Sequence, residues 1–321
     1  MMKLLPFVTA LCGLSVCAAA GEYDQLPFQY DLKYFQLNGS VLQVREKQWL
    51  PSRDSFFFNT AASLTPDNSY RLERSLDLQF NAGGQVLNQN SSLPDERKRN
   101  ELKATGRSFY YQKDKLIAIR DTEGKDKADS VAYHYKKNGL MDYYTVFNGK
   151  NDLVYKMSYV YKNGRVATVR KNDKENRAVS MVKYKYIDTQ LQECQYFDEQ
   201  YRLTETRRYS FKAMPEGQLN ESYAVTLPDG HMKEGMSLVK DSLGRILEQN
   251  VINGEREVTE YRSFQYGQQG QPVAEKVFSS LQESDITNRY TYDDKGNWIK
   301  KEIFYSGRLR SVILRELQYA G

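Results

Sequence analysis

The chain has 321 residues, of which 46 are Lys or Arg and 41 are Asp or Glu, so its formal net charge at pH 7 is only +5. Because acidic and basic residues are intermixed, this composition argues against a nucleic-acid-binding protein, which concentrates its basic residues. The mean hydropathy is −0.72, and charges interrupt every long stretch after the N-terminus. The mature protein is therefore expected to have no transmembrane helix.

Residues 1–20 have the pattern of a secretory signal peptide. Lys3 gives the positively charged start, residues 4–16 are largely apolar, and residues 18–20 are small, as signal peptidase requires. The sequence therefore predicts an exported protein, either periplasmic or extracellular, whose mature chain begins at Gly21.

The chain has three cysteines, and two of them, Cys12 and Cys17, lie in this signal. Leu14-Ser15-Val16-Cys17 resembles a bacterial lipobox, which implies an alternative in which a lipid on Cys17 anchors the protein. After simple cleavage, Cys194 is the only cysteine left, so no disulfide can form within the mature chain. We expect Cys194 to be a buried residue without a chemical role.

After the signal peptide, the sequence predicts one continuous β-domain with two parts. Residues 21–125 form its less regular part. Within them, residues 45–75 interrupt the pattern that is clear farther along the chain. Trp49-Leu50-Pro51 and Phe56-Phe57-Phe58 predict an irregular segment there, which would close the N-terminal end of a sheet.

Residues 126–321 form the regular part and carry a tandem repeat. The repeat is sharpest in residues 290–298, where two tyrosines at alternate positions precede a polar stretch with Gly and then an apolar residue. Further copies in this part are Tyr133–Met141, Tyr159–Val166, Tyr184–Leu191, Tyr209–Leu219, Met236–Ile246 and Phe264–Pro272, and copies in residues 21–125 are Tyr34–Val41, Leu78–Val86 and Phe109–Leu116. From residue 114 to residue 296, successive turn residues are 25, 25, 25, 28, 27, 26 and 26 positions apart. Such spacing is typical of a repeat architecture.

Each copy has the pattern of a β-hairpin. Aromatic residues two positions apart lie on the same face of a strand, and Gly and Asn accept the positive φ of a tight turn. The second residue after each turn residue is apolar, which predicts that it is shielded on the outgoing strand: Val41, Val86, Leu116, Met141, Val166, Leu191, Leu219, Ile246, Pro272 and Trp298. The sequence therefore predicts an all-β protein whose tandem antiparallel hairpins, about ten in number, form an extended, twisted or coiled meander sheet.

Tyr290-Thr291-Tyr292-Asp293-Asp294-Lys295-Gly296-Asn297 resembles the YD repeat of the RHS family, in which Tyr-x-Tyr-Asp-x-x-Gly is followed by an apolar residue. Residues 198–203 and 241–246 resemble the second half of that core, and residues 161–165 are similar to the variant MORN repeat. Both resemblances imply arrays of β-hairpins. In the RHS family such arrays coil into shells or scaffolds around other polypeptides, but we expect this short array not to close a shell on its own.

The sequence shows no pattern typical of an enzyme site. His134 alternates with tyrosines and is expected on the opposite face from them, and His231 follows a Pro-Asp-Gly turn signature. No Cys and His spacing suits zinc, and no glycine-rich phosphate loop is present. Asp293-Asp294 could serve glycoside hydrolysis, but these positions suit a turn better. We therefore expect no enzyme, cofactor or metal, and a glycan-active enzyme is only the third alternative.

The tyrosines, 25 in all, are the remaining candidate site. A tyrosine row in a sheet either packs as core against cross-strand neighbours or stays partly exposed and binds a sugar chain or a peptide, because Tyr combines an apolar ring with a polar tip. We predict that six tyrosines bind an envelope glycan or an extended polypeptide: Tyr133, Tyr135, Tyr159, Tyr161, Tyr184 and Tyr186. The predicted function is a non-catalytic cell-envelope or secreted protein with a binding or scaffolding surface. The alternative is an accessory shell or presentation component of a toxin or secretion system.

Overall fold

The computed structural model describes residues 32, 35–51, 70–94, 102–121, 129–279 and 282–321. These residues form a 20-stranded antiparallel sheet and a short 3-10 helix at Pro215–Gly217. The predicted signal peptide with Cys17, and Phe56-Phe57-Phe58, lie outside the described residues.

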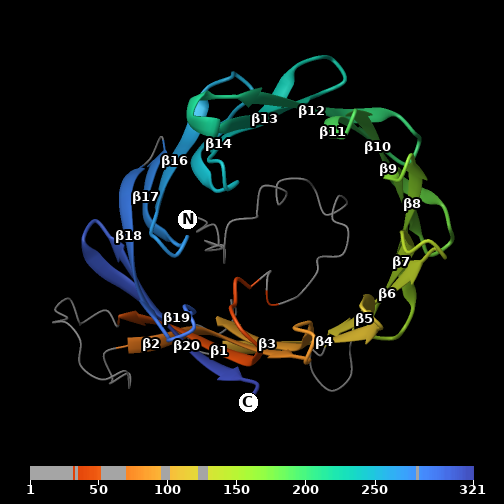
Figure 1. Ribbon diagram of the computed structural model, residues 1–321. Helices are drawn as coiled ribbons and strands as arrows, with labels where there is room; N and C mark the ends of the chain where they lie inside the picture. The colour runs from red at the N-terminus through yellow and green to blue at the C-terminus, as the bar shows by residue number, and fades with distance from the viewer. Residues whose placement is uncertain (1–31, 33–34, 52–69, 95–101, 122–128, 280–281) are drawn as a thin grey trace.

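The sheet is a meander that closes on itself. The strands are β1 (Val41–Pro51), β2 (Tyr70–Phe80), β3 (Val86–Pro94), β4 (Leu102–Gln112), β5 (Lys115–Asp121), β6 (Ser130–Tyr135), β7 (Met141–Phe147), β8 (Leu153–Lys162), β9 (Arg165–Asp173), β10 (Ala178–Ile187), β11 (Gln190–Phe197), β12 (Leu203–Ala213), β13 (Leu219–Thr226), β14 (Met232–Lys240), β15 (Ile246–Ile252), β16 (Val258–Tyr266), β17 (Pro272–Ser279), β18 (Gln282–Tyr292), β19 (Trp298–Tyr305) and β20 (Arg308–Tyr319). Each strand pairs with its neighbours in the chain, and β1 pairs with both β2 and β20. The result is a closed barrel (Figure 1).

Closure corrects the prediction of an extended meander and the expectation that so short an array would stay open. β1 and β20 align from Val41 opposite Tyr319 to Trp49 opposite Val312. An open sheet would leave unpaired N–H and C=O groups along two long edges, and pairing the edges satisfies them. The repeat describes single hairpins, whereas closure depends on strand tilt and on the twist accumulated over the whole sheet.

The repeat that closes the barrel is divided between the two ends of the chain. Val41, only 1% exposed, comes from the N-terminal copy, and Tyr319 opposite it comes from the last strand. Asn297 joins the two ends. Its side-chain oxygen accepts a hydrogen bond from the Asn38 N–H at 2.7 Å, and its amide nitrogen donates to the Asn38 carbonyl at 2.9 Å and to the Tyr319 hydroxyl at 2.8 Å.

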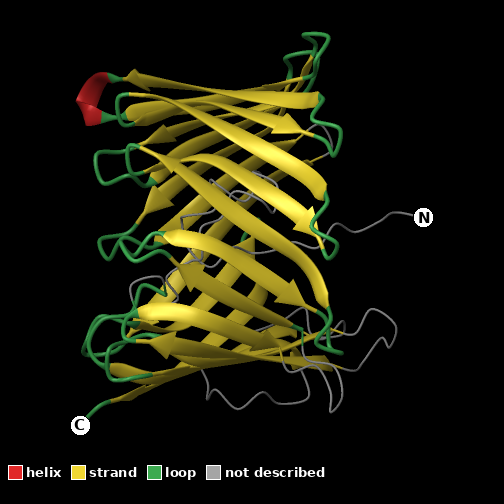
Figure 2. Cartoon of the chain, turned by 90° about the vertical axis from the view of Figure 1, so that its right-hand side faces the viewer, coloured by secondary structure: helices red, strands yellow, loops and turns green. Residues whose placement is uncertain are grey.

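The turns lie where the repeat predicted them. The five glycines Gly139, Gly164, Gly244, Gly270 and Gly296 all have φ between 77° and 88°, a region that side chains other than Gly rarely occupy. Figure 2 shows the turns gathered at the two ends of the barrel, with the strands tilted between them. The predicted hairpins are therefore confirmed, and the ten apolar positions after the turns are all buried or half-buried, as expected.

Many turns at both ends of the barrel share one hydrogen-bond pattern. An Asp side chain accepts the backbone N–H four residues later: Asp173 from Arg177 at 2.8 Å, Asp198 from Arg202 at 2.9 Å, Asp241 from Arg245 at 2.9 Å and Asp293 from Asn297 at 2.8 Å. The period of the sequence repeat thus contains two turns of similar construction, one at each end of the barrel.

The predicted irregular segment at residues 45–75 is wrong where the structure describes it. Residues 45–51 belong to β1 and residues 70–75 to β2, with a bulge in the pairing between Gln48 and Trp49. The alternation of a strand is present, but its inner positions include Glu46 and Gln48, which are 3% and 7% exposed. These buried polar residues concealed the apolar alternation from which a strand is normally predicted.

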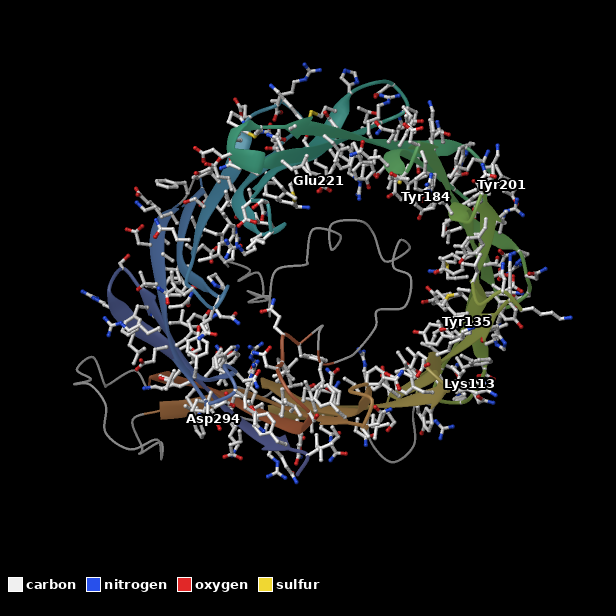
Figure 3. The ribbon with its side chains drawn as sticks, in the orientation of Figure 1. Lys113, Tyr135, Tyr184, Tyr201, Glu221 and Asp294 are labelled. Carbon is white, nitrogen blue, oxygen red and sulfur yellow. The ribbon has the colours of Figure 1, made fainter. Side chains whose placement is uncertain are left out.

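The two faces of the wall differ in chemistry. Tyr135, Tyr184 and Glu221 project from the inner face (Figure 3), and the strand pairings extend this assignment around the barrel because side chains alternate between faces. The outer face carries charged residues at mid-strand, including Arg208, which lies 3.0 Å from Glu193. Most of the aromatic residues of the repeat face inward.

Candidate functional site

All six predicted tyrosines lie on the inner face of three neighbouring hairpins. Tyr133 and Tyr135 are on β6, Tyr159 and Tyr161 on β8, and Tyr184 and Tyr186 on β10. The register adds three tyrosines to this face, because Tyr144 pairs with Met157, Tyr155 with Val146, and Tyr196 with Val182. We call the nine residues the tyrosine wall: Tyr133, Tyr135, Tyr144, Tyr155, Tyr159, Tyr161, Tyr184, Tyr186 and Tyr196.

The middle of the tyrosine wall is packed as core. The Tyr144 ring centroid lies 5.8 Å from that of Tyr133, 6.3 Å from that of Tyr155 and 6.4 Å from that of Tyr159. Burial, reinforced by the neighbouring phenols, raises the pKa of Tyr144 well above its ordinary value. Tyr159 is 4% exposed, whereas the other five predicted residues are half-buried. The wall therefore combines a buried centre with partly accessible rings around it.

Several tyrosine hydroxyls tie one hairpin to the hairpin before it. The Tyr135 hydroxyl donates to the Leu116 carbonyl at 2.8 Å, and the Tyr266 hydroxyl donates to the Ile246 carbonyl at the same distance. Both acceptors are the apolar residues that the repeat places after the turn. Burial raises the pKa of Tyr135 and of Tyr266, so both phenols stay protonated and able to donate. The repeat thus places the donor and the acceptor of one hydrogen bond on neighbouring hairpins: the tyrosine hydroxyl donates to the backbone carbonyl of the shielded apolar residue.

A basic side chain from the preceding hairpin lies over the second aromatic ring in several copies. The distances from the charged group to the ring centroid are 5.2 Å for Lys115 and Tyr135, 5.1 Å for Lys136 and Tyr161, 5.7 Å for Arg165 and Tyr186, 4.8 Å for Arg245 and Tyr266, and 3.5 Å for Lys295 and Tyr319. These are favourable cation–π positions. This feature was not predicted from the sequence, although a Lys or Arg near the turn residue of each copy indicates it.

The inner face of β13–β17 has two tyrosines, Tyr223 and Tyr266, and carries ion pairs beside them. Arg262 donates from Nε to Glu260 at 2.7 Å and from Nη1 to Glu275 at 3.2 Å, and Lys240 pairs with Glu221. Burial raises the pKa of Glu275, and the charge of Arg262 opposes that shift. We call this face the ion-pair wall. Two parts of the inner face therefore differ in chemistry, one rich in tyrosine and the other in ion pairs.

Neither histidine belongs to the tyrosine wall. His134 is exposed on the outer face and stacks on Tyr143, with ring centroids 4.2 Å apart. His231 lies in an exposed turn with its Nδ1 3.0 Å from Asp229. Both placements confirm the expectation from the sequence.

Asp293 and Cys194 have the structural places predicted for them. Asp293 accepts hydrogen bonds from the backbone N–H groups of Lys295 and Asn297 at 3.0 and 2.8 Å, so it shapes its turn. Cys194 is fully buried. Across the described ranges, no three His, Cys, Asp or Glu side chains gather as metal ligands would. In the same ranges, no helix has the length and apolar character needed to cross a membrane.

The sequence matches no protein-family model and none of the curated proteins. Similar solved structures include a porin-like protein from Bacteroides uniformis, with 8% identity over 88% of this chain and 98% of that chain and a TM-score of 0.35. A porin-like protein from Bacteroides vulgatus has 12% identity over 87% of this chain and 98% of that chain, with a TM-score of 0.28. TcdB2-TccC3 without its hypervariable C-terminal region has 11% identity over 75% of this chain but only 17% of that chain, with a TM-score of 0.30.

These similarities are coarse and leave the RHS and MORN repeats as resemblances only. What the fold defines is a class: a closed, antiparallel, 20-stranded barrel built from tandem hairpins. Its inner face is divided between a tyrosine wall and an ion-pair wall.

Proposed function

We propose that the protein is an exported, non-catalytic binding barrel that holds an extended polymer along the tyrosine wall. The observation that carries the proposal is the gathering of tyrosines on one face of successive hairpins, with five of the six predicted residues half-buried rather than enclosed. Because neighbouring strands lie about 4.8 Å apart, the same pair of rings recurs about every 10 Å. A periodic site of this kind suits a periodic ligand.

The chemistry of the wall suits a sugar chain or an extended polypeptide. Each tyrosine offers an apolar ring for stacking and a polar tip for hydrogen bonding. Since some hydroxyls are already used between hairpins, as at Tyr135, the ring faces supply most of the contact. We therefore expect weak and broad binding that is distributed over several rings.

The outer face supports a barrel that works in water. A lipid-facing barrel wall needs an apolar outer band, whereas this wall has Arg45 and Lys47 on β1 and Lys183 and Lys185 on β10, all exposed. Together with the predicted signal peptide, this favours the periplasm or the cell exterior. N-terminal sequencing of native material is expected to give Gly21, and a start at an acylated Cys17 would instead establish a lipoprotein.

The test is binding of the purified protein to peptidoglycan and to surface polysaccharide from the host. We expect the double variant Tyr161→Ala/Tyr186→Ala to lose most binding while its Tm changes modestly. The matched control is Tyr110→Ala, because Tyr110 is 47% exposed and faces outward from β4. Full binding by the folded double variant would refute the proposal. Unfolding of the double variant would show that these rings are core.

The closed circumference of the barrel favours a second candidate, an accessory shell that encloses a partner polypeptide. A photo-crosslinking residue placed at Tyr184, on the inner face, distinguishes the two in host cells. Crosslinks to a polypeptide from this position, and none from the exposed Tyr201, would support the shell. Crosslinks to polysaccharide would support the binding barrel.

A further inference from the structure

One arc of the barrel rim carries a concentration of positive charge. At the hairpin ends β4–β5, β6–β7 and β8–β9, residues 113–115, 136–140 and 162–165 contain six Lys or Arg and one Asp. Four of the six basic residues are exposed, and Lys136 and Arg165 are half-buried. A rim of one sign raises the local concentration of oppositely charged ligands.

Among the described hairpin ends at this rim, the concentrated positive charge lies at β4–β9, beside most of the tyrosine wall, whereas the β10–β11 end carries Asp188 and no basic residue. At the corresponding ends of β14–β15 and β18–β19, residues 241–245 and 293–297 contain two basic and three acidic residues. Residues 267–271, between β16 and β17, carry no charge. The basic arc, at β4–β9, and the tyrosine wall, on β6–β11, therefore overlap in the same part of the barrel.

Ring and cation form a repeated unit within this arc. Lys115, Lys136 and Arg165 each lie over the second tyrosine of the next hairpin. The acidic groups that face these cations are few: Asp142 lies 3.7 Å from Lys136, Asp114 precedes Lys115, and the Asp188 backbone carbonyl accepts a hydrogen bond from Arg165. When Lys113, Lys137 and Lys162 are counted as well, each of the three hairpin ends keeps a net positive charge beside a ring.

We propose that the ligand of the tyrosine wall is an acidic polysaccharide that carries an anionic group on every second sugar. This inference rests on the proposed function and names the ligand class. A sugar ring would stack on each tyrosine while its carboxylate or sulfate meets the adjacent Lys or Arg. The units recur about every 10 Å, which is comparable with the length of an extended two-sugar repeat. An extended acidic peptide repeats its side chains on one face about every 6.7 Å and would fall out of register.

The experiment compares three probes of similar length by calorimetry: hyaluronan oligosaccharides, which alternate acidic and neutral sugars, neutral chitin oligosaccharides, and poly-glutamate. We expect hyaluronan to bind about tenfold more tightly than the neutral probe at low salt, with the difference shrinking as salt screens the charges. The variant Lys136→Gln/Arg165→Gln is expected to weaken hyaluronan binding by about tenfold, since each of the two half-buried charges contributes about threefold. The control variant Lys212→Gln/Lys276→Gln removes two exposed lysines from elsewhere on the barrel and is expected to bind as the parent does.

Equal binding of hyaluronan and the neutral probe would overturn the acidic ligand and leave the binding barrel standing. Poly-glutamate binding as tight as that of hyaluronan would replace the polysaccharide by a polypeptide. Failure of all three probes would refute this inference, and if host polysaccharide also fails to bind, the proposed function falls with it. A loss of binding shared by the control variant would show a non-specific charge effect and would also overturn the inference.

Discussion

The tyrosine wall and the ion-pair wall use the same hairpin for different purposes. On β8 the repeat positions are Tyr159 and Tyr161, and on β14 they are Leu238 and Lys240, yet both strands lead into turns closed by a glycine at positive φ, Gly164 and Gly244. The backbone repeat therefore depends on the turn and on the apolar residue after it. The aromatic pair can be replaced by other residues without loss of the hairpin, and its identity determines the chemistry of the inner face.

The energetics of the two walls differ accordingly. In the tyrosine wall, Met157 and Tyr159 are 1% and 4% exposed, so their apolar surface is removed from water. In the ion-pair wall, the side chains of Arg262 and Glu260 are both 31% exposed, so solvent screens part of their attraction. We infer that the tyrosine wall is the more stable half of the barrel.

The largest expected effect tests this difference directly. Met157→Ala is expected to cost about 3 kcal/mol in the free energy of unfolding, because it leaves a cavity in a closed cluster. Arg262→Gln is expected to cost about 1.5 kcal/mol, since solvent partly screens Glu260, whereas Glu275, which is 19% exposed, loses the charge that opposes the effect of its burial. Urea denaturation measures both variants. Equal losses would mean that the two walls do not differ in stability.

The second prediction is that the turns contribute equally to stability beside both walls. Gly164→Val and Gly270→Val are both expected to cost about 2 kcal/mol, because a β-branched residue is strained at positive φ. The φ angles of these glycines are 77° and 78°, although one lies beside each wall. Lys162→Val, at an exposed strand end, is expected to change stability by less than about 0.5 kcal/mol. If Lys162→Val costs as much as Gly164→Val in thermal unfolding, the turn does not govern the hairpin.

The response to acid is expected to be the same beside both walls. Hydrogen bonds from Arg177 to Asp173, and from Arg245 to Asp241, lower the pKa of each carboxyl despite the opposing effect of burial. A lowered folded-state pKa stabilises the protein above the unfolded value of about 4, and this stabilisation is lost as pH falls through the folded value. Asp173→Asn and Asp241→Asn keep an acceptor for the turn but remove the titration. Each variant is expected to lose less stability than the parent between pH 5 and pH 2, and parallel curves would contradict this.

The smallest expected effect lies at the border between the walls. Tyr201, in the turn between β11 and β12, has φ 61° at the position where three related turns have Asn151, Asn176 and Gly230 and a fourth has Arg256. Tyr201→Gly is expected to raise stability by about 0.5 kcal/mol, because relief of the strained backbone slightly exceeds the extra entropy of the unfolded chain. Tyr201→Phe keeps the strain and is expected to leave Tm unchanged. A lower Tm for Tyr201→Gly would show that the Tyr201 ring makes a contact whose stabilisation exceeds the cost of the backbone strain.

The sequence by itself determined the local structure of this protein. The spacing of aromatic residues, turn glycines and apolar positions predicted the hairpins, because strand alternation and positive φ depend on a few neighbouring residues. The same repeat located the six predicted tyrosines. Tyr144, Tyr155 and Tyr196 were missed because they lie outside the repeated motif. Strand alternation already places Tyr155 on the face of Tyr159, whereas only the cross-strand register brings Tyr144 and Tyr196 to that face.

The tertiary structure alone decided that the sheet closes. Closure joins residues that no local pattern relates: Arg315 donates to Glu46 at 3.0 Å although 269 positions separate them, and Asn297 joins Asn38 to Tyr319. It also decided that the tyrosines face inward, opposite a wall of ion pairs. Twist and tilt accumulate over the whole sheet. Whether its first and last strands pair therefore depends on the complete barrel and not on any single repeat.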